Sequence, residues 1–383
     1  YWIERLKEAG PYENFYTMGM RGIHDSGMEG VKTLQEKTDA LQQVIDDQRK
    51  LLSKYVDKDV EKIPQAFVPY KEVLQIMENG LQLPEDITLI WCDDNYGYMT
   101  RLSDKEQQKR NGGAGVYYHL SYWGRPHDYM WLCTTQPGLI YSEMKQAYDC
   151  NARRLWVVNV HDLKPAAYDL ELFLDMAWNP RQYNAGNLLE HPRRFCAQQF
   201  GKDQADEAMR ILNLYSKYNG RVTGEMLDRN TYNLETGEWK QVSDEYLKLE
   251  AEALRQYISL KPEYKDAYKQ LILFPVQAMA NLYEMYYAQV MNHKLYKENN
   301  PQANEWADKV EQAFARDKAL SDDYNNVMSG GKWKNMMIQK HIGYTSWNDN
   351  FPADTLPQTY RIENPEKAPE IRISFAALRT SQM

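Results

Sequence analysis

The chain has 383 residues, a length typical of about two domains, and 43% of them are hydrophobic while 26% are charged, which excludes a disordered or fibrous protein. Lys and Arg number 46 against 54 Asp and Glu, and the net charge of −8 argues against a nucleic-acid partner, which would favour a basic surface. No stretch approaches the roughly 20 apolar residues that a membrane-spanning helix needs, so we expect no membrane partner.

Short β-rich runs alternate with helical stretches from about residue 14 to residue 180, a pattern typical of repeated βα units. We predict strands at residues 14–21, 65–70, 87–92, 115–121 and 155–160. Helices are predicted at residues 1–9, 31–55, 137–150 and 165–178. The helix at 31–55 has apolar residues near a 3.6 period, and the last two begin with Pro, which suits a first helical turn.

The β-rich runs stop after Pro180, and the sequence then predicts helices at residues 205–218, 243–260, 264–294 and 301–322. Four such helices favour a bundle. We therefore predict three parts: residues 1–180 as the C-terminal portion of a (β/α)8 catalytic barrel, residues 181–337 as a helical bundle, and residues 338–383 as a linker into a further β domain. A strand-like run at residues 370–375 belongs to the last part.

Polar side chains follow each of the five predicted strands, at Arg21 and Asp25, at Glu72, at Asp93, at His119 and at Asn159. In a (β/α)8 barrel the carboxyl ends of the strands converge on one face, whereas in a doubly wound sheet they spread along an edge. We favour the barrel. The fold class expected is α/β, the later strands of a TIM barrel followed by an α-helical bundle, with the strands forming an open arc.

Several carboxylates and abundant polar-tipped rings at these strand ends indicate glycoside cleavage. Tyr and Trp number 29 and 10 against 9 Phe, and such rings stack on sugars as well as fill cores. Glycoside hydrolysis needs two carboxyl groups, one of them a proton donor. The residues alone leave open which two of the four strand-end carboxylates would serve, namely Asp25, Glu72, Asp93 and Asp94.

Metal or nucleotide chemistry is the less favoured interpretation of the same strand ends. Adjacent Asp93 and Asp94 could hold Mg²⁺, but strand neighbours point to opposite faces, so only one should face a pocket. The glycines at 112, 113 and 115 precede a strand and do not match a GxGxxG loop. We therefore expect no cofactor and no metal.

Five sequence segments together resemble glycoside hydrolase family 115, the xylan α-glucuronidases. They are MGMRGIHDSGM, PYKEV, WCDDNYGYMTRL, YYHLSYWGRPHDYMWL and RRLWVVNVHDLKP. The resemblance implies inverting hydrolysis that releases glucuronic acid or its 4-O-methyl form from xylan side branches. It also implies a four-domain architecture in which a (β/α)8 barrel and a helical bundle lie between an N-terminal α/β domain and a C-terminal β domain.

Carried over position by position, the resemblance implies roles for two carboxylates. Glu72 matches the general acid, and Asp25 matches a candidate base. The remaining matched pocket positions imply a substrate-binding role for Arg21, His24, Tyr70, Asp93, Asn95, Tyr117, His119, Tyr122 and Asn159.

The resemblance also implies the partners and the location of the protein. The partner would be glucuronoxylan or its oligosaccharides, the full-length protein is compatible with a homodimer, and a secreted or periplasmic location is expected. The chain opens at Tyr1 without a leader, so we expect it to be part of something longer. Two alternatives remain: a non-catalytic carbohydrate-binding barrel, and a metal-dependent barrel lyase or isomerase that uses Asp93.

Overall fold

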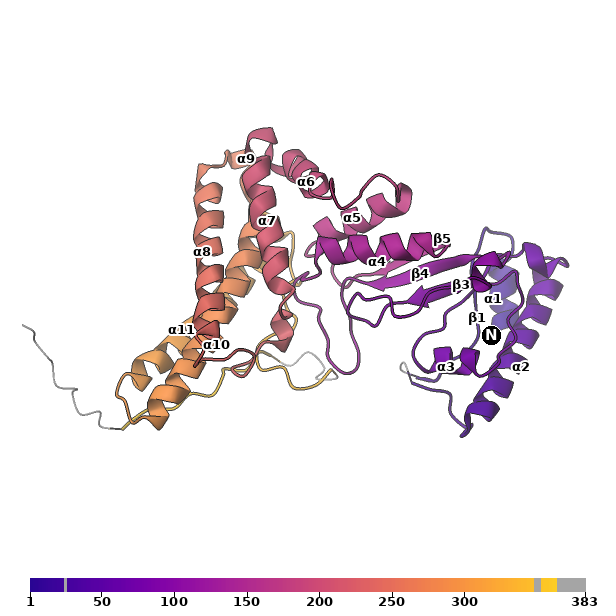
Figure 1. The fold of residues 1–383 in the computed structure, drawn as a ribbon, viewed down its shortest axis with the longest axis horizontal. Coiled ribbons are helices and arrows are strands. Elements are labelled where there is room, and N and C mark those ends of the chain that lie inside the picture. Colours follow the sequence, from indigo (N-terminus) through magenta and orange to yellow (C-terminus); the bar gives the residue numbers. More distant parts are fainter. Residues whose placement is uncertain (24–25, 348–352, 364–383) are drawn as a thin grey trace, which may run out of the picture.

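Five parallel strands form one sheet whose spatial order follows the order of the chain (Figure 1). The computed structural model describes residues 1–23, 26–347 and 353–363, so the predicted run at residues 370–375 lies outside the described residues. The strands are β1 (Tyr16–Met18), β2 (Gln65–Phe67), β3 (Thr88–Cys92), β4 (Ala114–His119) and β5 (Ala152–Asn159). An order of β1 to β5 without reversal is that of a barrel arc, not of a doubly wound sheet.

The register of the sheet aligns the carboxyl ends of neighbouring strands. Met18 pairs with Phe67 at the end of β1 and β2, and His119 pairs with Asn159 at the end of β4 and β5. Gly115 is required on β4, because a Cβ there would collide with the Leu155 carbonyl of β5. The polar residues after the strands are therefore brought to one edge of the sheet, as the sequence predicted.

Helices cover the outer face of the sheet with apolar side chains. They are α1 (Trp2–Ala9), α2 (Leu34–Tyr55), α3 (Glu72–Glu78), α4 (Pro137–Asp149) and α5 (Ala167–Trp178). A capping box starts α2, in which Thr33 Oγ1 accepts from the Glu36 N–H at 3.2 Å and Glu36 Oε2 accepts from the Thr33 N–H at 2.9 Å. Leu41 and Ile45 of α2 and Phe173 of α5 are buried in the same cluster as the sheet residues.

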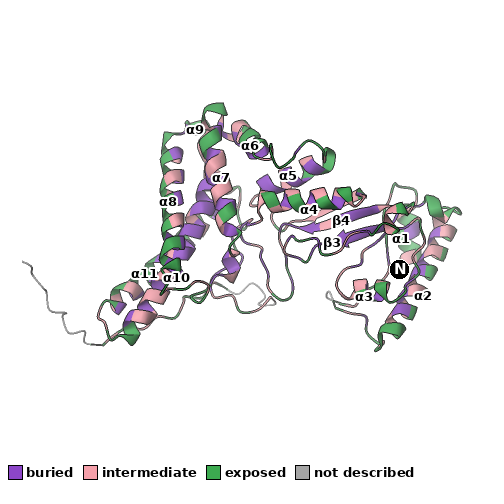
Figure 2. Cartoon of the chain, in the orientation of Figure 1, coloured by how far each residue is buried: buried purple, intermediate pink, exposed green. Residues whose placement is uncertain are grey.

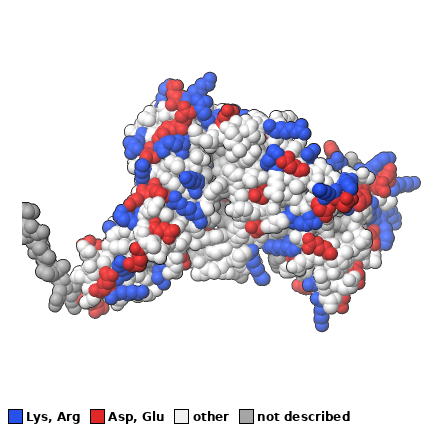
Figure 3. Space-filling view, viewed as in Figure 1, with Lys and Arg blue, Asp and Glu red and all other residues white. Residues whose placement is uncertain are grey.

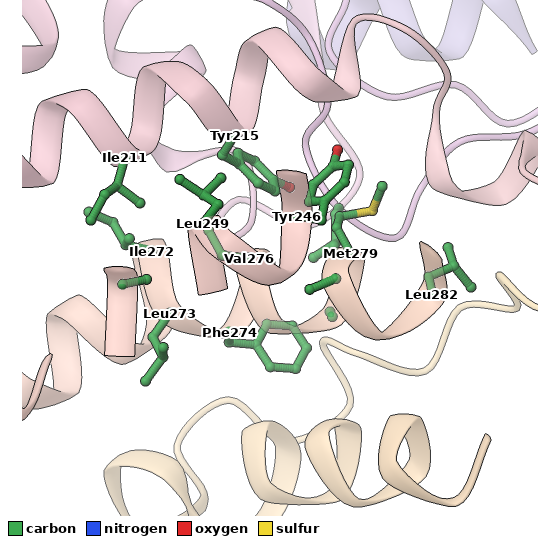
Figure 4. Packing of buried hydrophobic residues seen from close by; sticks show 14 of the residues in the cluster. Ile211, Tyr215, Tyr246, Leu249, Ile272, Leu273, Phe274, Val276, Met279 and Leu282 are labelled. Carbon is green, nitrogen blue, oxygen red and sulfur yellow. The ribbon is translucent and has the colours of Figure 1, made fainter. Parts of the chain in front are cut away.

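The second half of the chain forms a helical bundle with its own core. Its helices are α6 (Glu190–Phe200), α7 (Ala205–Asn219), α8 (Glu238–Ser259), α9 (Pro262–Tyr268), α10 (Phe274–Lys297) and α11 (Ala303–Asp322), with a π-helical segment Lys269–Leu273 before α10. Figure 2 shows their buried faces turned toward one another, and Figure 4 shows Tyr215, Tyr246, Leu249 and Met279 packed between α7, α8 and α10. The predicted barrel portion followed by a bundle is thereby confirmed.

The helix predictions differ from the structure in three places. Helices α3 and α6 were not predicted: α3 is a single short segment, and α6 carries Pro192 and a polar sequence that weaken its periodicity. One predicted helix over residues 264–294 corresponds to α9, the π-helical segment and α10 in succession. Tyr283 and Tyr286 of α10 are buried in the core of the bundle.

The surface shows no single-sign field on the face drawn in Figure 3, where Lys and Arg are interspersed with Asp and Glu. The described residues on that face form no continuous basic track. Among the described helices, none combines the length and the apolar character needed to cross a membrane.

Asp169, in the first turn of α5, is a buried carboxyl group. Its Oδ2 accepts a hydrogen bond from the Cys133 thiol at 2.7 Å, while Oδ1 has no hydrogen-bond partner among the described residues. Loss of hydration on burial raises the pKa of Asp169 to about 7, from an ordinary value near 3.8. The folded protein therefore keeps a proton that the unfolded chain releases.

We predict that Asp169→Asn makes the protein more stable than wild type as the pH rises. The free energy of unfolding of the wild type falls as the pH rises from the unfolded pKa to the folded pKa of Asp169, because only the unfolded chain releases the proton in this range. Asn does not titrate, so the variant does not lose stability in this way. Between pH 5 and pH 8 the advantage of the variant should grow by roughly 3 kcal/mol in urea unfolding. The exposed Asp39→Asn serves as the control. A pH-independent difference between Asp169→Asn and wild type would contradict the prediction.

Candidate active site

A cavity of about 340 Å³ opens at the carboxyl ends of the strands. Every strand contributes to it or is followed by a residue that does. The lining residues are Arg21, Val68, Tyr70, Cys92, Tyr117, His119, Tyr122, Trp123 and Asn159. Arg21, Tyr70, Tyr117, His119, Tyr122 and Asn159 were predicted to bind substrate, so the structure brings these six together.

A bidentate ion pair joins Arg21, after β1, to Glu72, the first residue of α3. Arg21 Nε donates to Glu72 Oε1 and Arg21 Nη2 donates to Glu72 Oε2, both at 2.9 Å. Both side chains are only partly exposed, at 23% and 28%, which preserves the strength of a planar fork pairing. The Arg21 guanidinium also lies over the Tyr70 ring, 5.1 Å from its centroid. Arg21 lines the cavity, and Glu72 is linked to it by this ion pair.

Lys71 belongs to this site although the sequence analysis did not select it. Its Nζ donates to the Tyr122 hydroxyl at 2.9 Å and lies 4.9 Å from the centroid of the Tyr70 ring. Its backbone has φ 50°, a left-handed conformation that is unfavourable for a side chain with a Cβ and is often found at functional sites. The signal that could have found Lys71 is its position between Tyr70 and Glu72 at a strand end.

Asp93 is buried and holds His119 in place. Its side chain is 0% exposed, and Oδ1 lies 2.5 Å from His119 Nδ1. Oδ2 accepts from the N–H groups of Gly97 at 3.0 Å and His119 at 3.2 Å. Asp93, predicted to bind substrate, is therefore not part of the cavity lining and contacts that lining through His119.

Asp94, the next residue, contacts the backbone of its own loop and not His119. Its Oδ1 accepts from the N–H groups of Tyr96 at 2.9 Å and Tyr98 at 3.2 Å, which closes the loop after β3. The expectation that one of these two aspartates would face the pocket is not met, because neither belongs to the cavity lining. Asp94 accepts hydrogen bonds from the backbone of its own loop, and Asp93 contacts this backbone and His119, so neither carboxylate lines the cavity.

Asn95 and Asn159 orient the tyrosines of the cavity. Asn95 is buried with φ 74°, and its Oδ1 accepts from the Tyr70 hydroxyl at 2.8 Å. Asn159 Nδ2 donates to the Tyr117 hydroxyl at 3.3 Å. Asn159 lines the cavity, whereas Asn95 supports it from behind through Tyr70.

Two ionisable groups of the lining stay neutral. Burial raises the pKa of the Cys92 thiol to about 12, with a smaller effect from the charge of Asp93. Burial likewise raises the pKa of the Tyr117 hydroxyl. The wall around Arg21 therefore offers uncharged hydrogen-bonding groups, as the hydroxyls of a sugar require. The sequence signal that could have identified Cys92 is its position as the last residue of β3. Alternate residues of a strand share one face, and the end of β3 lies at the cavity.

His24 and Asp25 lie outside the described residues, so the structure does not test them. The described residues on either side form a tight loop, in which the Gly22 N–H donates to the Ser26 carbonyl at 2.9 Å. Gly22 is required there, since a Cβ would collide with the Gly27 carbonyl. A Cβ built at Gly27 would lie 3.8 Å from Glu72 Cγ, so this loop returns against the candidate acid.

Other features of the described residues lie apart from this chemistry. A larger groove of about 570 Å³ lies between the sheet and the bundle, but its Glu143 accepts from the Met99 N–H and its Arg221 pairs with Glu245. Two groups have the spacing of metal ligands, Glu171 with Asp175 and His191, and Asp317 with His341 and Asp354. Neither group lines the cavity, which therefore remains the candidate active site.

The parallel strands form an arc, and their carboxyl ends bring an Arg–Glu pair, amides and polar rings to one cavity. This is the arrangement of a (β/α)-barrel glycoside hydrolase. The chain belongs to glycosyl hydrolase family 115, whose profile matches residues 1–226. The family resemblance of the five sequence segments is thereby confirmed.

A solved structure similar to the chain is that of BtGH115A, described as a novel family GH115 4-O-methyl-α-glucuronidase with specificity for decorated arabinogalactans. The two share 37% sequence identity with a TM-score of 0.77. The similarity covers 88% of this chain and 45% of that one, so this chain spans less than half the length of that protein. No curated protein matches the chain.

We predict that Asp93→Ala destabilises the fold by about 3 kcal/mol, because it leaves the buried His119 ring and backbone N–H groups without their acceptor. Asp94→Ala is the matched control at the next position. The Asp94 side chain is exposed, so water replaces the lost acceptor and the cost should stay below about 1 kcal/mol. Urea denaturation measures both. Equal losses in the two variants would rule out the buried role of Asp93.

Proposed function

We propose that the protein to which this chain belongs hydrolyses α-linked glucuronic acid or 4-O-methylglucuronic acid side groups of a polysaccharide. The observation that carries this proposal is the Arg21–Glu72 fork at a cavity lined by neutral hydrogen-bonding groups and rings. Family membership and the α-glucuronidase named for BtGH115A support it.

Arg21 would bind the carboxylate of the uronic acid. A uronate has the same planar pair of oxygens as Glu72, so it fits the same guanidinium fork. The amide of Asn159 and the hydroxyls of Tyr117 and Tyr70 line the same cavity and suit the ring hydroxyls of the sugar.

Binding of the substrate would prepare Glu72 for proton donation. Without substrate, Arg21 forms a bidentate ion pair with Glu72. Once a uronate occupies Arg21, Glu72 loses its partner and lies near a second carboxylate, and this arrangement favours its protonated form. Glu72 then gives its proton to the glycosidic oxygen as the bond to the uronic acid breaks.

The second carboxylate would be Asp25, with inversion of the anomeric centre. In this reaction water attacks the anomeric carbon from the face opposite the leaving sugar, and Asp25 takes up the proton of that water. Inversion requires the two carboxyl groups to lie about 6.5–9.5 Å apart, which leaves room for the water. Asp25 follows Arg21 by four residues and Gly27 lies against Glu72, which supports this pairing.

Xylan is the polysaccharide that we propose, because the sequence segments resemble the xylan α-glucuronidases. Decorated arabinogalactan is the second candidate, since this is the substrate class named for BtGH115A. Either polymer is too large to enter a cell intact, which supports a secreted or periplasmic location for the enzyme.

The alternatives of a binding-only barrel and of a metal-dependent lyase are less favoured. A binding-only site would not need a carboxylate that exchanges its Arg partner with the substrate. The lyase would need Asp93 as a metal ligand, but the oxygens of Asp93 are buried and occupied by N–H donors and His119.

Glu72→Gln should separate acid catalysis from binding. We predict a loss of about 10³-fold in kcat on glucuronoxylan, because the leaving sugar needs protonation, and a loss below about tenfold on an aryl glucuronide with an acidic phenol. Release of the acid and of the phenol is measured in a protein that carries the complete barrel. Glu78→Gln, exposed on the same helix, is the control. Equal losses on both substrates would remove Glu72 from the acid role.

Arg21→Lys should weaken recognition of the carboxylate, because an ammonium group cannot form the planar fork. We predict that glucuronic acid binds about tenfold or more weakly, whereas the much weaker binding of glucose does not change. Titration calorimetry or competitive inhibition measures both sugars, with Arg193→Lys on α6 as the control. If uronic acid binding is unchanged and only the acidic limb of the pH profile is displaced, the result would instead assign Arg21 to tuning the base Asp25.

A further inference from the structure

Trp123 lies at the mouth of the candidate cavity with most of its ring accessible to solvent. It belongs to the same lining as Arg21, yet it is 63% exposed, whereas its neighbour Tyr122 is 4% exposed. Tyr122 therefore belongs to the buried wall of the cavity, and Trp123, the next residue, belongs to its solvent-accessible rim. An accessible indole at the edge of a cavity offers a flat aromatic face to a ligand.

The loop that carries Trp123 is rigid on its inner side. Tyr122 and Tyr129 exchange two backbone hydrogen bonds of 3.1 and 2.9 Å, so the loop is closed like a hairpin. The Gly124 N–H donates to Asp128 Oδ1 at 2.5 Å. Gly124 is required, because a Cβ there would collide with the Tyr122 hydroxyl. The exposure of Trp123 is therefore not a sign of a loose loop.

The outer side of the same loop is held by residues from far along the chain. His127 stacks on Tyr344 with ring centroids 3.8 Å apart, and the Asp128 N–H donates to the Tyr344 hydroxyl at 3.0 Å. The Arg125 guanidinium lies over the ring of Trp347, 5.2 Å from its centroid. Contacts on both sides preorganise the position of Trp123, which lowers the entropic cost of binding a ligand there.

From these observations we propose that Trp123 is the stacking platform for the neutral sugar that bears the uronic acid branch. This inference rests on the proposed function and names the subsite next to its uronic acid pocket. Arg21 and the amide and hydroxyl groups of the wall would hold the charged sugar, which leaves the rim for the sugar to which it is linked. The C–H face of a neutral pyranose suits an indole ring, whereas a carboxylate does not.

The experiment compares Trp123→Ala with wild type on two substrates, a branched oligosaccharide that carries glucuronic acid and an aryl glucuronide. The protein must carry the complete barrel. We expect KM for the oligosaccharide to rise about tenfold and the aryl glucuronide kinetics to remain within about twofold. Trp123→Phe should restore most of the loss, because it keeps an aromatic face. Trp178→Ala, at a Trp that is 92% exposed and outside the cavity, should leave both substrates unchanged.

A second measurement follows binding of the neutral, unbranched oligosaccharide by titration calorimetry, which depends neither on hydrolysis nor on the Trp123 indole as a reporter. We expect Trp123→Ala to weaken this binding. If Trp123→Ala changes neither measurement, or impairs both substrates equally, the platform assignment is wrong while the proposed function stands. If wild type hydrolyses neither substrate, the proposed function fails, and Trp123 is then no subsite of that reaction.

Discussion

The Asp93 carboxylate connects the loop after β3 to the end of β4, and the shape of the cavity depends on this connection. One oxygen contacts the His119 ring, and the other accepts hydrogen bonds from the N–H groups of Gly97 and His119. A buried charge is tolerated when several donors compensate it, and its removal would leave those donors unpaired. His119, fixed in this way, lies among three tyrosines of the wall, with ring centroids 6.4 Å from Tyr70, 5.2 Å from Tyr117 and 5.5 Å from Tyr122.

Most of the polar contacts around the cavity join one strand end to the next. Arg21 contacts Glu72 between the ends of β1 and β2, Tyr70 contacts Asn95 between β2 and β3, and Asn159 contacts Tyr117 between β5 and β4. The geometry of the site is therefore tied to the register of the parallel sheet. A slip of one residue in any strand would turn its cavity side chains to the other face.

The helical bundle contributes to the site through the loop that follows β4. Glu225 accepts hydrogen bonds from the N–H groups of Met130 and Trp131, and the Trp131 ring stacks on His341 at 3.7 Å. Burial by itself would lower the pKa of His341, but Asp317 and Asp354 outweigh it and raise this pKa to about 9. A buried imidazolium between two carboxylates thus joins the bundle to the loop that holds Tyr122 and Trp123. The segment after the bundle holds the outer side of this loop, which ties the active-site rim to residues more than 200 positions away.

The sequence by itself determined the strands, most of the helices, the barrel order and the kinds of residue at the strand ends, because periodicity and turn chemistry are local properties of the chain. It also carried the family segments, and the structure groups six of the substrate-binding residues that they implied in one cavity. Only the tertiary structure decided that Arg21 pairs with Glu72, 51 residues away, that Asp93 supports His119 instead of facing the cavity, and that Lys71 and Trp123 belong to the site. These outcomes depend on strand register, loop closure and contacts between distant segments, and no local pattern of residues encodes such distances.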